Sequence, residues 1–323
     1  MKRSFFDALE GVDGHLPHWY TEARTAAWKE YEGTPWPQRN HEAWRFADLK
    51  KLAFDDIVDA AEVGEAEGAD LITRSVALEE NAGRIIFAND RLIADPLLDA
   101  EFAQKGVIFK PLSQALVEDT DLVRLSFMQQ PARLGSAKFA ALHRARLRDG
   151  IFLYIPKDVS LSRPVEVFHW LSGENAAIFP HSLIVSGPGS TAAIAEYIAS
   201  AGQQPGFCGG VTDLVAGENS SLTHVRTQNL SEQAHSLHVS SSLAAAGANI
   251  RAFVLNLGCK WSRSEFTARL SGEGAGTDML AVCIPENSQE MDMRTLQLHE
   301  KTHTTSNLLY KNALYDEART IFA

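Results

Sequence analysis

The turns between Gly150 and Phe322 constrain the fold of this chain more than any other feature. Short strand-like runs recur there at a mean spacing of about 14 residues, as expected of an all-β array. The turns are rich in Gly, Asn and Pro, as in Gly187-Pro188-Gly189, because Gly and Asn accept positive φ and Pro fixes a corner. Such a series can form a sandwich, a barrel or a β-solenoid, and periodicity alone leaves all three open. The expected strands begin near Ile151, Val165, His181, Thr191, Val211, Ser221, His235, Asn249, Trp261, Gly276, Met291, His303 and Arg319.

Two of these runs alternate clearly with a period of two residues, which predicts strands with two distinct faces. Within Ser221–Gln228 the residues Thr223, Val225 and Thr227 fall on one face, and His224, Arg226 and Gln228 on the other. Within Trp261–Leu270 the residues Phe266, Ala268 and Leu270 share one face, opposite Arg263, Glu265 and Arg269.

The first half of the chain has a different character, and we place a domain boundary near Gly150. Residues 1–149 are expected to form a small, mostly helical α/β domain, and residues 150–323 the β core. Gly150 is expected to terminate the last helix of the first domain. Helices are predicted over Pro17–Glu32, His41–Leu52 and Lys138–Arg148, strands over Arg84–Ala88, Arg91–Ile93 and Val107–Phe109, and an exposed loop over residues 61–70.

Composition and charge narrow the classes of function. The net charge of −11 argues against a general nucleic-acid-binding or anionic-membrane-binding protein, because such proteins carry an excess of Lys and Arg. Three cysteines without a CxxC pair suit a reducing compartment, so we expect a cytoplasmic protein. The start, Met1–Asp7, begins like an export signal, but Asp7 and Glu10 interrupt the apolar region. No apolar run is long enough to span a membrane.

The usual motifs of nucleotide and acyl-transfer enzymes are absent from the sequence. It contains no P-loop, no GxSxG elbow and no GxGxxG after a strand. The glycine-rich Ser186–Ser190 is interpreted as a turn. The three cysteines are interpreted as small buried side chains rather than ligands, and the strand histidines as satisfied or exposed residues. These residues are Cys208, Cys259, Cys283, His224, His235 and His238.

One short motif, His299-Glu300-Lys301-Thr302-His303, fits the HExxH pattern of zinc proteases. That chemistry needs a helix, which brings the two imidazoles at i and i+4 to one metal with the Glu beside the bound water. The flanking residues favour a strand instead, because Met291–Leu298 alternates and β-branched threonines follow. We therefore expect no metal at His299 and His303, and keep a zinc-dependent hydrolase as the alternative function.

Several segments, taken in order, resemble the SufB/SufD family of the SUF iron–sulfur cluster assembly system, with a closer likeness to SufD. Single pieces are weak, but their shared order over most of the chain is specific. The matching segments are Trp44–Leu49, with Ala47 where Thr is usual; Gly150–Lys157 with Arg163–Val165; His181–Val185 with Ala195–Tyr197; Leu257–Gly258 with Arg263–Glu265 and Leu270–Ala275; and His303–Ser306 with Tyr310–Lys311 and Asp316–Arg319, with Asn312 where Gly is usual.

The resemblance implies a right-handed β-helix core and a non-catalytic scaffold that acts with a SufB-like subunit and a SufC-like ATPase. It implies no intrinsic cofactor, because the assembled complex handles the iron–sulfur cluster. Family members usually continue past the position of Ala323 with further coils and helices that dock the ATPase. We therefore expect a truncated core without that docking region, either as a fragment or as a shortened relative. No residue of this chain inherits the docking and cluster-forming roles of that missing part; no catalytic residue is expected, and the sequence assigns no cofactor-binding residue.

Overall fold

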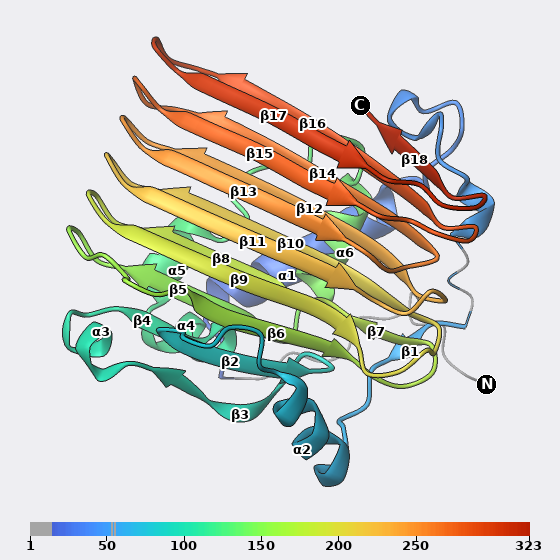
Figure 1. Cartoon of the computed structure of the whole chain (residues 1–323), viewed down its shortest axis with the longest axis horizontal. Coiled ribbons are helices and arrows are strands. Elements are labelled where there is room, and N and C mark those ends of the chain that lie inside the picture. Colours follow the sequence, from blue (N-terminus) through green and yellow to red (C-terminus); the bar gives the residue numbers. More distant parts are fainter. Residues whose placement is uncertain (1–14, 53, 55) are drawn as a thin grey trace.

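The computed structural model describes residues 15–52, 54 and 56–323, so the signal-like start at Met1–Asp7 lies outside the described residues. Its strands stack in parallel from the N-terminal to the C-terminal end of the core (Figure 1). Among the described residues they form two facing sheets, which we call sheet A, with ten strands, and sheet B, with eight. From His181 onward, consecutive strands alternate between the sheets, and each pairs in parallel with the strand before it in the same sheet. This arrangement is a β-solenoid of about six turns, which confirms the predicted β-helix.

The strand bounds follow the turn spacing. Sheet A contains β1 (Val58–Asp59), β4 (Ile108–Pro111), β5 (Gly150–Ile155), β7 (Ala176–Ile178), β8 (His181–Ser186), β10 (Gly206–Ala216), β12 (His235–Ala244), β14 (Trp261–Leu270), β16 (Glu290–His299) and β18 (Arg319–Phe322). Sheet B contains β2 (Gly83–Ala88), β3 (Arg91–Leu98), β6 (Val165–Leu171), β9 (Thr191–Ser200), β11 (Ser221–Asn229), β13 (Asn249–Asn256), β15 (Gly276–Cys283) and β17 (Thr305–Asn312).

The space between the sheets, which we call the lumen, holds the largest apolar cluster. Alternate residues of each strand face it, so Leu222 and Ile250 of sheet B meet Phe266 and Ala268 of sheet A there. The turns of successive coils stack just as closely. A Cβ on Gly272 would lie 1.9 Å from the backbone N of Ala246, so only glycine fits at this point of contact.

The helices lie mostly outside sheet A, where α1 and α6 pack together on its outer face (Figure 1). Two predicted helices, over Pro17–Glu32 and Lys138–Arg148, are confirmed with small shifts at their ends. The helical segments are α1 (His18–Gly33), η1 (Glu42–Trp44), η2 (Leu49–Lys51), α2 (Glu65–Arg74), α3 (Ala100–Gln104), α4 (Leu112–Glu118), α5 (Thr120–Ser126) and α6 (Ala137–Arg146), of which η1 and η2 are 3-10 turns.

Three local predictions for the first half were wrong. Residues 61–70 were expected to be an exposed loop, but most of them belong to α2, whose acidic first turn suits the positive end of a helix dipole. His41–Leu52 is not one helix but two 3-10 turns. Gly150 does not terminate α6, which ends at Arg146, and instead begins β5. No helix among the described residues is long and apolar enough to cross a membrane.

Candidate functional site

A chain of buried polar groups bridges the two sheets inside the lumen. Glu196 of β9 accepts hydrogen bonds from the Ser182 hydroxyl of β8, at 2.5 Å, and from Nε2 of His224 on β11, at 2.8 Å. Burial acts to raise the pKa of the Glu196 carboxyl, but the hydrogen bond and charge of His224 outweigh it and lower that pKa to about 2. The carboxylate is therefore ionised, and its two oxygens are already occupied by partners.

Two further histidines of the lumen are neutral. Nε2 of His238 lies 2.9 Å from the Thr212 hydroxyl, and the ring of His169 stacks on Phe87. Burial lowers the pKa of His169 to about 4 and that of His238 well below its usual value. The interpretation of the strand histidines as buried structural residues fits His224 and His238, which both have hydrogen-bond partners. His235 is also buried, on the outer face of sheet A.

All three cysteines are free and buried. Burial raises the pKa of the Cys208 and Cys259 thiols, and that of Cys283 to about 11, so each stays protonated at neutral pH. A protonated thiol is a poor nucleophile and a poor metal ligand. The amide of Gln228 contacts the sulfur of Cys259 at 2.8 Å, and the Cys283 sulfur lies 2.9 Å from that of Met293.

The HExxH segment has the strand–turn form that its flanks predict. His299 is the last residue of β16, and its ring nitrogens contact the hydroxyls of Thr304 and Ser306 at 2.8 and 3.0 Å. His303 lies in the following turn with φ of 57°, and its exposed ring faces Glu273 at 3.8 Å. The described residues contain no group of three or more His, Cys, Asp or Glu placed to hold a metal. The helix that zinc proteases require is thus replaced by a strand and a turn.

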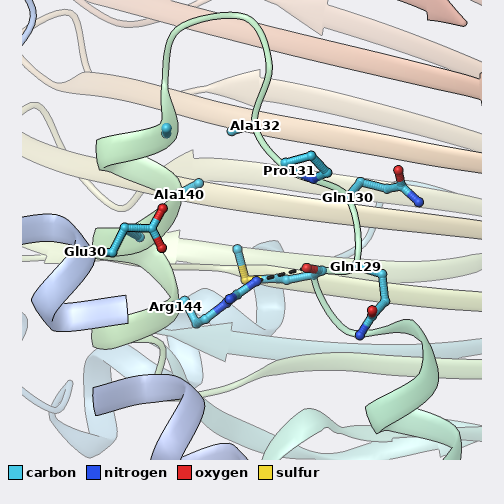
Figure 2. A pocket seen from close by; sticks show the side chains of 10 residues that line it. Glu30, Gln129, Gln130, Pro131, Ala132, Ala140 and Arg144 are labelled. Atoms are coloured by element: carbon cyan, nitrogen blue, oxygen red, sulfur yellow. Dashed lines mark hydrogen bonds between the residues drawn. The ribbon is translucent and has the colours of Figure 1, made fainter. Parts of the chain in front are cut away.

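A surface pocket of about 280 Å³ opens between α1, α6 and the loop that follows α5 (Figure 2). Its floor is made of small side chains of α6, including Ala137 and Ala140, and Glu30 of α1 stands at its edge. The guanidinium of Arg144 donates to the backbone O of Met128 at 2.9 Å, so this side chain fixes the loop rather than reaching into open space.

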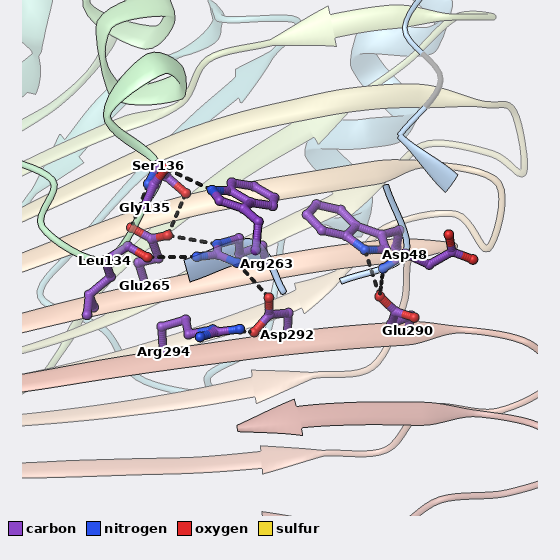
Figure 3. Close-up of polar contacts among 11 residues, drawn as sticks. Asp48, Leu134, Gly135, Ser136, Arg263, Glu265, Glu290, Asp292 and Arg294 are labelled. Carbon is purple, nitrogen blue, oxygen red and sulfur yellow. Dashed lines mark hydrogen bonds and ion pairs between the residues drawn. The ribbon is translucent and has the colours of Figure 1, made fainter. Parts of the chain in front are cut away.

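A buried ionic network lies on the outer face of sheet A (Figure 3). Arg263 of β14, fully buried, donates to Glu265 at 2.7 Å and to Asp292 of β16 at 2.6 Å. Arg294 donates to the other oxygen of Asp292 at 2.8 Å. The loop before α6 closes the network, since the Ser136 hydroxyl donates to Glu265 at 2.6 Å and Arg263 donates to the backbone O of Leu134. Each charge in the centre therefore has an opposite charge beside it.

The segment with η1 and η2 covers the next part of the same face. Trp44 stacks on Trp261 of β14 with ring centroids 6.2 Å apart, and the guanidinium of Arg263 lies over the Trp44 ring. The backbone N of Asp48 donates to Glu290 of β16 at 2.9 Å (Figure 3). The sequence did not predict this contact, although two of the segments that resemble the family, Trp44–Leu49 and Arg263–Glu265, meet here. They fasten the N-terminal half to the outer face of the coils.

Comparison with known proteins assigns this architecture to a family. A family model described as SufBD protein N-terminal region matches residues 4–167. A second, described as SUF system FeS cluster assembly, SufBD core domain, matches residues 169–323. The chain therefore belongs to the SufBD family.

Individual proteins similar to this chain carry descriptions of the same family. The iron–sulfur cluster assembly protein SufD of Bacillus subtilis (strain 168) is 27% identical over 313 residues, which cover 95% of this chain and 70% of the relative. An iron–sulfur cluster assembly SufBD family protein of Staphylococcus epidermidis (strain ATCC 12228) is 24% identical, over 95% of this chain and 67% of the relative. A protein of the same description from Staphylococcus aureus (strain USA300) has the same identity and coverage.

Proposed function

We propose that this chain is a SufD-like scaffold component of iron–sulfur cluster assembly, which acts with a SufB-like subunit and a SufC-like ATPase in the cytoplasm. The observation that carries the proposal is the match of both family regions, in order, along nearly the whole chain. The similarity to SufD of Bacillus subtilis favours the SufD-like role. The two-sheet core with its fastened N-terminal half supplies the rigid body that a scaffold needs.

The chemistry of the described side chains supports a non-catalytic role. The cysteines are protonated thiols, and the carboxylate of Glu196 is held by two hydrogen bonds. The iron–sulfur cluster is cargo of the assembled complex and not a resident cofactor of this chain. The zinc-hydrolase alternative gains no support from the strand–turn form of His299 and His303.

Coexpression tests the partners. The chain is produced with the SufB-like and SufC-like proteins of the same genome and analysed by affinity purification and size-exclusion chromatography. We expect the SufB-like subunit to elute with the chain and ATP hydrolysis to depend on the SufC-like subunit. Retention of neither partner by a chain with native circular dichroism would refute the proposal.

Metal analysis tests the alternative function, a zinc-dependent hydrolase. Zinc content is measured for the purified chain, for His299→Ala and, as a matched surface control, for His18→Ala. We expect substoichiometric zinc in all three proteins. One zinc per chain that is lost only in His299→Ala would instead support the hydrolase.

A further inference from the structure

Arg226 of β11 is a buried cation whose hydrogen-bonding capacity is largely unused. Its side chain faces the lumen and is 2% exposed. Among the described residues, no acceptor lies within hydrogen-bond distance of Nε or Nη1. Nη2 makes one long contact, 3.4 Å from the Ser264 hydroxyl of β14 in the opposite sheet. An arginine stays protonated in proteins, so the positive charge persists in this apolar setting.

The nearest anion of the chain, the Glu196 carboxylate, acts on this charge but leaves Nε and Nη1 without an acceptor among the described residues. Glu196 is the register partner of Arg226 on β9, yet its oxygens accept from Ser182 and His224, and it forms no ion pair with the guanidinium. Arg294, which also has an unpaired nitrogen, differs because Asp292 lies 2.8 Å from it. A buried charge without such a partner is strongly destabilising. Nε and Nη1 of Arg226 therefore need an acceptor that the described side chains do not supply.

Apart from the Glu196 carboxylate, the groups around the guanidinium are neutral. The Ser264 hydroxyl lies across the lumen, and the Tyr310 hydroxyl and the thiols of Cys208 and Cys283 are close enough to interact with the charge of Arg226. Burial raises the pKa of each of these thiols and of Tyr310, so all keep their protons. The strands that follow β11 in sheet B place short side chains, Val254 and then Ala281, in register with Arg226.

We propose that the lumen binds one small monovalent inorganic anion, of halide size, against Nε and Nη1 of Arg226. The two unpartnered N–H groups match one small acceptor, whereas a phosphate or a carboxylate chain would bring further negative charge beside Glu196 or an apolar tail without a partner. The bound anion gives Nε and Nη1 the acceptor that they lack.

Anion-dependent stability tests the site in the purified 323-residue chain. Thermal unfolding is followed at increasing sodium bromide, with sodium gluconate keeping the ionic strength constant. A ligand that binds only the folded state raises Tm with its concentration. We expect Tm to rise with bromide in the wild type and to lose this dependence in Arg226→Met. Arg251→Met is the matched control, because Arg251 lies on the exposed outer face of the neighbouring β13, paired with Asp278.

Crystals grown in bromide provide a second, independent measurement. We expect an anomalous peak within hydrogen-bond distance of Arg226 Nε in the wild type and none there in Arg226→Met. A water molecule at this position, with equal bromide dependence of Tm in the wild type and both variants, overturns the proposal. If Arg226→Met fails to fold, the anomalous peak in the wild type alone decides.

Discussion

The outer faces of the two sheets share one architecture but differ in what covers them. On sheet A, Arg263 and Glu265 are 0% and 2% exposed because the N-terminal segments lie over them. On sheet B, Arg251 and Asp278 form a comparable pair on neighbouring strands, yet the arginine side chain is 54% exposed. The strands are equally regular in both sheets. Burial of charge is therefore set by the covering segment and not by the ladder itself.

The apolar residues repeat the same contrast. Leu237 of β12 is buried against the N-terminal helices, in a cluster that includes Phe139 and Trp261. Phe253 and Leu280, register partners on sheet B, are only half-buried. An ion pair or a leucine should thus contribute very differently to stability on the two faces, and five substitutions test this difference.

The largest expected effect is at Arg263. Arg263→Ala leaves Glu265 and Asp292 buried without their shared cation, so we expect the free energy of unfolding to fall by about 3–5 kcal/mol. The matched change on the other face, Arg251→Ala, removes a solvent-exposed pair and should cost at most about 1 kcal/mol. Urea unfolding followed by circular dichroism measures both.

Equal losses for Arg263→Ala and Arg251→Ala would show that the covering segment does not desolvate the network. Arg263→Met sharpens the test, because it keeps much of the side-chain volume under the Trp44 ring while removing the charge. We expect it to remain far less stable than the wild type for the same reason.

A smaller difference is expected for the apolar pair. Leu237→Ala creates a cavity beneath the N-terminal helices and should lower the free energy of unfolding by about 3 kcal/mol. Leu280→Ala, on the open face, should lower it by about 1 kcal/mol, because a half-buried leucine loses less apolar burial. The same urea titrations apply. A larger loss at Leu280 would indicate that another surface covers sheet B.

The sequence predicted the coils well because turns and alternation are local signals. Most strand starts in the core, such as Ser221 and Trp261, were placed correctly, and the alternation within β11 is confirmed. Two strands of the core were misplaced or missed: β10 begins at Gly206 rather than near Val211, and β7 was not predicted. Both strands contain small residues, which carry little alternation in hydropathy.

The alternation did not reveal which face of a strand is buried. In β11 the buried face is the polar one, with His224 and Arg226, because Glu196 on the neighbouring β9 and Ser264 across the lumen meet it. In β14 both faces are buried, since segments more than 100 residues earlier cover Arg263 and Glu265. Such partners are distant in sequence, so no local pattern identifies them.

The last expected effect is a pH dependence of the covered face. His143 of α6 donates from Nδ1 to the backbone O of Gly209 at 2.7 Å and accepts at Nε2 from His181, 3.0 Å away. Burial lowers the pKa of His143 to about 4, below its unfolded value of about 6.5. Between these values the unfolded chain binds more protons, so the stability that His143 contributes is complete above pH 6.5 and is lost as the pH falls towards 4.

The variant His143→Gln separates the pH dependence due to His143 from that of the other buried titratable groups. Glutamine offers a donor and an acceptor but does not titrate, so buried groups common to both proteins, such as Asp213, largely cancel in the comparison. We expect the wild type to lose up to about 1.4 kcal/mol of unfolding free energy per pH unit relative to the variant between pH 6.5 and 4. His18→Gln, at an exposed position on α1, should leave the pH profile unchanged. Parallel profiles for the wild type and His143→Gln would mean that the contact between α6 and sheet A admits a charged imidazole, and that this face is less well sealed than the Arg263 network implies.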